Sequence, residues 1–344
     1  MHKILSEYKL DAFLVLDRTN ASYLSNTTIP ECAVVLTKQK DFFFTDPRFQ
    51  EDAKDQVRGF RTVIAKNDFY PLLKQALKKV KTVGFESEHL SYSNYLELKK
   101  QLPGVKLVPI KGAVETKRII KNKQEIKTIR RSVKISKKVF KHIQKTIKPG
   151  LTEREICAEI ERKMKQEGAH APAFDTIVAS GPNSSRPHAA VTNRKIKRSD
   201  IVLVDFGADF NGYNSDLTRV VFLGKISTLF RQIYSIVLEA QEKAISRVKP
   251  GVKISEIDKI ARETIAKRGY GKYFLHATGH GIGRQVHERP NISLKNQDLL
   301  KPGMIFTVEP AIYFPGKFGI RIEDMVLVTG KHCEVLTDDI DKSI

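Results

Sequence analysis

The sequence has few cysteines, and those it has lie far apart. Its 344 residues include three, Cys32, Cys157 and Cys333, and no two of them form a CxxC pair. Zinc sites of the ribbon type are built from such pairs, so this class of site is excluded. An odd number of widely spaced cysteines also argues against a disulfide framework and favours reduced thiols.

Long apolar segments are also missing. No apolar run approaches the ~18 residues that a membrane span requires. Near the start of the chain, Glu7 and Asp11 interrupt the apolar core that a secretory signal peptide needs. We therefore expect no membrane association and a cytoplasmic protein.

Acidic residues are too few to balance the basic ones, 39 against 60, which gives a formal net charge of +21. Such an excess is a feature of many nucleic-acid-binding proteins. Much of it is local, however, because residues 117–148 contain thirteen lysines and arginines and one acid. Apolar residues recur in this segment at helical spacing, which predicts one amphipathic helix with a basic solvent face. We expect a solvated surface here and no nucleic-acid partner.

The length and patterning of the chain predict two domains. Residues 1–115 alternate short apolar runs with helical stretches, which is typical of an α/β domain. Strands are predicted at 12–16, 32–36, 41–45, 81–85 and 105–110, and helices at 68–80 and 91–101. The unit lacks GxGxxG and GxxxxGK[ST] motifs, so it shows no nucleotide site of these types. Residues 116–344 form the second domain.

The second domain contains an internal repeat. The segment KPGLTEREI (148–156) recurs as KPGVKISEI (249–257), 101 residues later. Downstream, SDIVLVDFGADF aligns with PGMIFTVEPAIY, which places Asp205 opposite Glu309, and Asp216 then falls near Glu323. The repeat predicts two related halves, each of which supplies two carboxylates from strand-like segments.

Five residues of this domain are spaced like metal ligands. Asp205, Asp216, Glu309 and Glu323 are charges in apolar surroundings, where they are costly unless paired or metal-bound. His280, from the motif TGHGIG, adds an imidazole. Four carboxylates and one imidazole suit two hard divalent ions, with Mn²⁺ preferred. Two such ions about 3.5–4 Å apart hold a bridging water and polarise a carbonyl, which predicts a hydrolase.

Separate histidines are needed for catalysis. His188, in SSRPH, and His287, in RQVHERP, lie in loops rich in glycine, proline and asparagine. Both are suited to hydrogen-bonding a substrate carbonyl or a developing oxyanion. The remaining histidines, His89 among them, lack any motif and are expected to have no role in the site.

Three more side chains are predicted near the ligands. Arg321 lies two residues before Glu323 on the same strand face and is placed to orient a ligand carboxylate. Tyr313 has a similar place after Glu309. His276, four residues before His280, either shares its face or packs beneath the site.

These motifs resemble those of the pita-bread metallopeptidases, in the branch of aminopeptidase P and prolidase. VDFGADFNGYNSDLTR, GHGIG…HE, TVEPAIY and RIED match in order and spacing, and the resemblance covers essentially the whole chain. It implies an α+β fold: a pita-bread catalytic domain with an internal pseudo-two-fold repeat, preceded by a creatinase-type α/β N-terminal domain. It also implies a homodimer and two divalent ions, Mn²⁺ first, with Co²⁺ or Zn²⁺ as alternatives.

The resemblance also implies the role of each ligand. Asp205 would bind one metal only, Asp216 and Glu323 would bridge the two, and His280 and Glu309 would bind the other. A bridging hydroxide would attack the scissile carbonyl, with Glu309 as the proton acceptor.

The resemblance extends to the substrate. His188 and His287 would contact substrate and transition state, and the family cleaves the bond between an N-terminal residue and a following proline. Asn291 stands where many prolidases have an arginine that holds the dipeptide carboxylate. This departure favours an Xaa-Pro aminopeptidase, with an Xaa-Pro dipeptidase as the alternative, since Arg289 offers a cation nearby.

Two more distant alternatives remain. One is a non-catalytic relative that binds nucleic acid or ribosomes, and the other is a metal-free hydrolase of the creatinase type. Both usually lose metal ligands, so the presence of all five argues against them.

Overall fold

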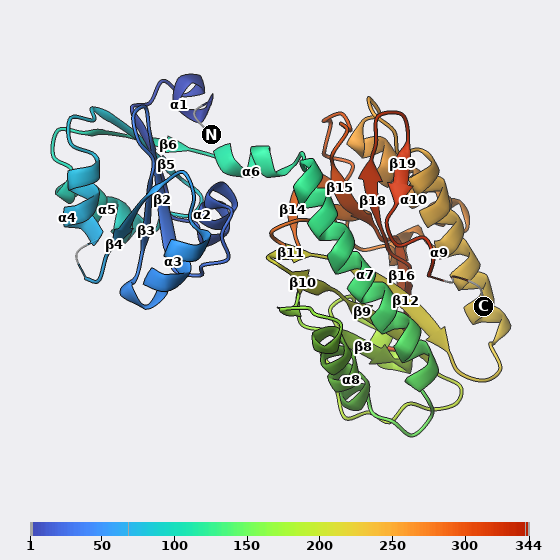
Figure 1. Cartoon of the computed structure of the whole chain (residues 1–344). Helices are drawn as coiled ribbons and strands as arrows, with labels where there is room; N and C mark the ends of the chain where they lie inside the picture. Colours follow the sequence, from blue (N-terminus) through green and yellow to red (C-terminus); the bar gives the residue numbers. More distant parts are fainter. Residues whose placement is uncertain (1–2, 68, 341, 343–344) are drawn as a thin grey trace. The chain divides into compact units, whose positions relative to one another are not determined.

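The structure, a computed structural model, describes residues 3–67, 69–340 and 342 (Figure 1). It divides into two compact units, Met1–Lys117 and Arg118–Ile344, so the boundary lies two residues beyond the predicted one. Within the described residues, no helix combines the length and apolar character that crossing a membrane requires.

The first unit is a six-stranded mixed sheet in the order β4-β3-β2-β1-β5-β6. Its strands are β1 (Ala12–Val15), β2 (Cys32–Thr37), β3 (Phe42–Thr45), β4 (Arg61–Ile64), β5 (Thr82–Glu86) and β6 (Lys106–Ile110). Its helices are α1 (Lys3–Glu7), α2 (Arg18–Ser25), α3 (Gln50–Gln56), α4 (Phe69–Ala76), α5 (Tyr92–Gln101) and α6 (Ala113–Arg118), with a short 3₁₀ turn, η1 (Pro47–Phe49). The five predicted strands are present, whereas β4 was not predicted because its residues are largely exposed and carry no apolar run. Residue 68, the first of the helix predicted at 68–80, lies outside the described residues.

Helices cover both faces of this sheet, as an α/β domain requires. Because strand side chains alternate between faces, Phe13 and Phe43 pack with α1, α2 and α3, whereas Leu14 and Phe44 pack with α4 and α5. The unit therefore has two apolar layers, one on each side of the sheet.

The second unit has the predicted repeat. Two helix pairs, α7 (Lys123–Thr146) with α8 (Glu153–Gln166) and α9 (Thr228–Ser246) with α10 (Ile254–Lys267), each precede a sheet. The first sheet has the order β12-β9-β8, from β8 (Ile177–Ser180), β9 (Ile201–Phe206) and β12 (Leu217–Phe222). The second has the order β14-β13-β15-β18-β19, from β13 (Gly279–Gly281), β14 (Glu288–Ile292), β15 (Ile305–Val308), β18 (Asp324–Val328) and β19 (Cys333–Val335). Smaller elements are β7 (Ala171–Pro172), β10 (Ala208–Phe210), β11 (Tyr213–Asn214), β16 (Ala311–Phe314), β17 (Phe318–Arg321), η2 (Gly181–Ser185) and η3 (Gly271–Tyr273).

The two-residue period of the central strands sets the direction of the predicted ligands. In β9, Val204 and Phe206 pack in the core of α7 and α8, so Asp205 between them lies on the opposite face. In β15, Phe306 and Val308 pack in the core of α9 and α10. Each half thus buries one strand face under its helices and leaves the other for polar groups.

The basic segment 117–148 is not one helix, contrary to the prediction. Helix α6 ends at Arg118, Ile120 forms a β-bridge with Met304, and α7 begins at Lys123. Asn122 caps α7, since its side chain accepts from the N–H groups of residues 124 and 125, and the Glu125 carboxylate accepts from the Asn122 N–H. The apolar positions that predicted the helix, residues 126–143, all lie within α7, and the capping box at its start was not recognised in the sequence.

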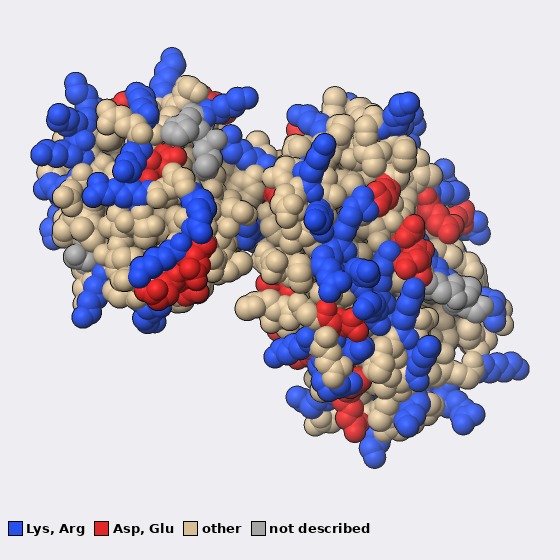
Figure 2. All heavy atoms as spheres, viewed as in Figure 1, with Lys and Arg blue, Asp and Glu red and all other residues tan. Residues whose placement is uncertain are grey.

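Lysines and arginines gather over α7 (Figure 2). Several of them form ion pairs: Lys138 Nζ lies 2.7 Å from Glu167 Oε2, and Lys137 Nζ lies 2.5 Å from Asp339 Oδ1. Arg130 pairs with Glu334. Acidic residues from elsewhere in the unit therefore offset part of the basic surface.

The two copies of the repeat differ in a helix cap, which gives a paired test. Thr152 caps α8 in a full capping box with Glu155, whereas Lys253 at the same place before α10 makes no side-chain cap bond. We expect Thr152→Ala to lower the free energy of unfolding by about 1 kcal/mol. Lys253→Thr should raise it, because Glu256 already occupies the third position after the cap, where a capping box needs a glutamate. Urea unfolding measures the free energy of unfolding of both variants. A decrease for Lys253→Thr as large as that for Thr152→Ala would contradict this account.

Candidate metal centre

The four predicted carboxylates lie in strands or directly beside them, in the two halves of the repeat. Asp205 lies within β9, Asp216 directly before β12, Glu309 directly after β15, and Glu323 between β17 and β18. The expectation that all four lie in strands is therefore wrong for three of them. At a strand end the backbone is free to leave the ladder, so the side chain can turn toward the other half.

The backbone at these strand ends is nevertheless held. The Glu309 N–H donates to the Thr278 carbonyl at 2.8 Å, and the Glu323 N–H donates to the Thr218 carbonyl at 3.2 Å. Because Glu323 and Thr218 come from different halves, this bond joins the two copies of the repeat.

The ligand atoms converge on one point. His280 Nε2 lies 3.2 Å from Glu309 Oε1 and 3.7 Å from Asp216 Oδ2. Ligand atoms of Asp216, His280 and Glu323 all lie within 4.8 Å of one another. Asp205 joins the group through its charge, which acts on both Asp216 and Glu323.

Three carboxylate oxygens in this group have no hydrogen-bond donor. They are Asp205 Oδ1, Asp216 Oδ1 and Glu323 Oε1, each buried and without a partner among the described residues. A buried carboxylate oxygen is costly unless it is hydrogen-bonded or binds a cation. The three oxygens therefore fit a site for divalent cations, to which hard oxygen donors bind well.

The electrostatics agree with this fit. Burial, with the charges of Glu309 and Asp205, raises the pKa of Glu323 to about 8. Burial and the neighbouring carboxylates also raise the pKa of Asp216 well above its usual value. For Glu309 burial acts in the same direction, but the hydrogen bond with His280 outweighs it and lowers the pKa to about 2. The site holds more negative charge than its own side chains neutralise.

The glycines that flank His280 allow the close approach of neighbouring chain segments. A Cβ at Gly279 would lie 1.9 Å from the Thr307 carbonyl oxygen, and one at Gly281 would lie 2.2 Å from that of Arg289. The His280 N–H donates to Thr307 Oγ1 at 3.1 Å. The GHG motif thus lets the ligand strand lie directly against its neighbours.

Arg321 holds one of the ligands, as predicted in general terms. Its Nη2 donates to Asp205 and its Nη1 to the Tyr313 hydroxyl, and its Nε lies 3.1 Å from Thr218 Oγ1. Thr218 in turn donates to Glu323 Oε2 at 2.7 Å. Asp205 and Glu323, from opposite halves, are therefore linked through two side chains.

His276 contacts Tyr313 and Phe274. Its Nε2 lies 3.3 Å from the Tyr313 hydroxyl, and its ring meets that of Phe274 edge-on. His276 therefore lies against Tyr313, which in turn contacts Arg321.

The two predicted catalytic histidines lie at the exposed side of the group. The ring centroid of His287 is 4.2 Å from that of His280. His188 follows Pro187, whose carbonyl accepts from Arg321 at 3.2 Å. Desolvation by the neighbouring side chains and the nearby charge of His280 lower the pKa of His287, which favours a neutral imidazole.

The sequence reasoning missed the threonines of the site. Thr218 contacts Glu323, and Thr307 Oγ1 donates to Glu309 Oε1 at 3.0 Å. Each threonine is two residues from a predicted ligand, Asp216 or Glu309. Same-face spacing along a strand was the signal that would have found them.

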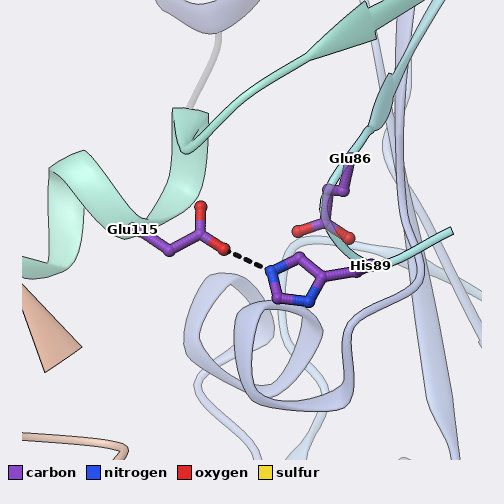
Figure 3. A group of neighbouring side chains, drawn as sticks. All are labelled: Glu86, His89 and Glu115. Atoms are coloured by element: carbon purple, nitrogen blue, oxygen red, sulfur yellow. Dashed lines mark hydrogen bonds and ion pairs between the residues drawn. The ribbon is translucent and has the colours of Figure 1, made fainter. Parts of the chain in front are cut away.

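A second group of possible ligands lies in the first unit, where Glu86, His89 and Glu115 converge (Figure 3). Here the oxygens have donors. Glu86 Oε2 accepts from the N–H groups of residues 16 and 17, and Glu86 Oε1 and Glu115 Oε1 both accept from Asn20 at 2.7 Å. His89 Nε2 also lies 2.7 Å from Glu115 Oε1. The group is a hydrogen-bond network that connects β5 with α6.

Cation removal should make stability depend on pH. Because the pKa of Glu323 rises from 4.5 to about 8, the folded protein keeps a proton that the unfolded chain releases in this range. The stabilisation is complete below about 4.5 and is lost as pH rises through about 8. We expect the Tm of chelator-treated protein to decrease as the pH is raised from about 4.5 to about 8. Adding Mn²⁺ should raise the Tm most at the alkaline end of this range.

The matched control for this experiment is Glu323→Gln, which removes the titrating group. Its Tm after chelation should depend less on pH. An equal Tm in chelator-treated wild-type protein at both ends of the range would contradict the electrostatic account.

The chain is similar to known proteins over its whole length. Residues 127–330 match metallopeptidase family M24, and residues 1–120 match the creatinase/prolidase N-terminal domain. An Xaa-Pro dipeptidase of Pyrococcus furiosus is 38% identical over 97% of this chain and 95% of its own. Among solved structures, an Xaa-Pro dipeptidase from Bacillus anthracis is 37% identical, covers 99% and 96% of the two chains, and has a TM-score of 0.95. An X-Pro aminopeptidase from Thermotoga maritima is 38% identical over 98% and 97%, with a TM-score of 0.92.

Proposed function

The chain belongs to metallopeptidase family M24, and from this premise we propose how its site works and which substrates it takes. It is a metal-dependent Xaa-Pro peptidase with a pita-bread catalytic domain after a creatinase-type N-terminal domain.

Five side chains hold two divalent ions in this proposal: Asp205, Asp216, His280, Glu309 and Glu323. The observation that carries it is the set of three buried carboxylate oxygens without a donor, contributed by both halves of the repeat. When bound, the ions lower the pKa of a shared water and polarise the scissile carbonyl.

The chain's own groups complete the reaction. Glu309, with its low pKa, is ionised at neutral pH and accepts a proton at its carboxylate. His188 and His287 hydrogen-bond the substrate carbonyl and stabilise the tetrahedral oxyanion. Arg321 holds Asp205 in place through a hydrogen bond. Tyr313 contacts Arg321, and His276 contacts Tyr313, so both help to fix the position of Arg321.

Substrate length divides the two forms of the proposal. Asn291 in place of an arginine favours an aminopeptidase acting on longer peptides. Relatives named Xaa-Pro dipeptidase, 37–38% identical over nearly the whole chain, favour cleavage of dipeptides. We therefore place the dipeptidase first, although the sequence alone favoured the aminopeptidase, to which one similar structure also corresponds by name.

Kinetics on matched peptides test this choice. With Mn²⁺ present, we expect the kcat/KM for an Xaa-Pro dipeptide to exceed that for the corresponding Xaa-Pro-Xaa tripeptide by about tenfold or more, since a site that binds the free carboxylate loses that contact with a longer peptide. A higher kcat/KM for the tripeptide would identify an aminopeptidase instead.

Metal analysis of two variants tests the ligand set. Asp216→Ala removes one of the carboxylates that would hold the ions, so we expect loss of bound metal and a kcat at least about 10²-fold lower. His89→Gln in the second histidine–carboxylate group is the control and should keep two ions and normal kcat. Full activity of Asp216→Ala would rule out the dinuclear mechanism.

The remaining expectations belong to the same proposal. The oxygen-rich donor set supports Mn²⁺ over Co²⁺ or Zn²⁺. A homodimer and a cytoplasmic location carry over from the family resemblance and the sequence. Proline-containing peptides are the proposed partners, with no role for nucleic acid.

A further inference from the structure

A buried group of charges lies behind the loop that carries His287. Arg118 and Lys121 are only 2% and 4% exposed, and both contact Glu288, the residue after His287. Arg118 Nη2 lies 2.5 Å from Glu288 Oε2, and Lys121 Nζ lies 2.9 Å from Oε1. Two cations from the start of the catalytic domain thus hold one carboxylate of the loop.

The same contacts close the loop on itself. Arg118 Nη2 also donates to Gln285 Oε1 at 2.8 Å, and the Gln285 N–H lies 3.3 Å from Glu288 Oε2. His287 therefore sits within a turn whose two ends, Gln285 and Glu288, are both fixed by Arg118.

The backbone near Lys121 is itself anchored. The Lys121 N–H donates to the Gly303 carbonyl at 2.9 Å. A Cβ at Gly283 would lie 2.5 Å from Glu288 Oε1 and 3.1 Å from Lys121 Cε, so the ion pair packs directly on the loop backbone. The position of Lys121 is thus fixed by its backbone, and the loop packs closely against its side chain.

The strand ladder alone does not place His287. β14 begins only at Glu288, and the register of its pairing with β13 shifts between His280 and Gly281. His287 is also exposed, so no core packing surrounds it. An added restraint is needed if its ring is to stay 4.2 Å from that of His280.

Stability is a poor explanation for this group. Desolvating two cations and a carboxylate costs several kcal/mol per ion, and apolar side chains in their place are often as stable or more so. Arg118 alone would balance the charge of Glu288. The second cation is explained by geometry, because it holds the other carboxylate oxygen and stops the carboxylate from rotating.

We propose that Arg118 and Lys121 are positioning residues that act through Glu288 to hold His287 beside His280. This inference rests on the proposed function, in which His287 contacts the substrate. Both cations contact Glu288, the residue directly after His287, so their effect on catalysis should pass through His287.

Lys121→Met tests the inference, since it removes the ammonium, keeps the length of the side chain and leaves Arg118 and Glu288 as a balanced pair. We expect kcat to fall about tenfold, because small displacements of a catalytic group are costly, while KM changes less than about twofold and two ions stay bound. Hydrogen exchange of residues 284–288 should become faster. Lys138→Met, which removes an exposed partner of Glu167, is the matched control and should change none of these quantities.

A double-mutant cycle separates positioning from general damage. In a His287→Ala background, Lys121→Met should lower kcat less than about twofold further, because its route of action is already gone. If Lys121→Met lowers the Tm too far for assay, Gln285→Ala provides the second arm, since it removes an Arg118 contact at a partly exposed site.

The outcomes can be told apart. Three results would overturn the positioning role alone. They are an unchanged kcat of Lys121→Met, an equal loss of kcat in the wild-type and His287→Ala backgrounds, and a loss of kcat that follows the loss of bound metal. A wild-type enzyme inactive on every Xaa-Pro peptide would instead overturn the proposed function on which the inference rests.

Discussion

The mutual repulsion of four carboxylates, three of them buried and one partly buried, is the constraint on which the catalytic domain depends. At 4 Å and an effective dielectric constant near 20, each pair of such charges repels by about 4 kcal/mol. Within the group, Arg321 contacts Asp205 and His280 contacts Glu309, but Asp216 and Glu323 each keep an oxygen without a donor. Divalent cations supply the missing positive charge, and the raised pKa values of Asp216 and Glu323 express the same deficit.

The repeat makes this convergence possible, and its asymmetry gives the carboxylates of the two halves different surroundings. The strands of each half turn one face to their own helices and the other to the opposite half, so equivalent carboxylates meet. The Glu323 N–H reaches Thr218, while the Asp216 N–H reaches Met325 Sδ, so the two halves hold each other in similar ways. Asp205, however, is paired with a guanidinium and Glu309 with an imidazole. Only Glu309 of the two has a pKa that is lowered to about 2, so this carboxylate is ionised throughout the neutral range.

The sequence was sufficient for those features that depend on local pattern and on the cost of burying charge. The grouping of the five predicted ligand side chains, the repeat and the two-unit organisation all have such a basis. It was insufficient where the outcome depends on partners far away in the chain. The break between α6 and α7 depends on a bridge to Met304, and the contacts of Arg118 with Glu288 span 170 residues. Arg321 was expected near a ligand carboxylate, but only packing decides that this carboxylate is Asp205.

Proximity of histidines and carboxylates does not by itself make a metal site, as the two groups in this chain illustrate. In the first unit, Glu86 and Glu115 accept hydrogen bonds from Asn20 and from backbone N–H groups, so a cation would have to displace existing donors. In the catalytic domain, the corresponding oxygens of Asp205, Asp216 and Glu323 face no donor in the described structure. The difference follows from the free energy of a buried oxygen, which is lowered by a hydrogen bond in one group and needs a cation in the other. Donor satisfaction, rather than residue type, is therefore the property that separates a structural network from a catalytic centre.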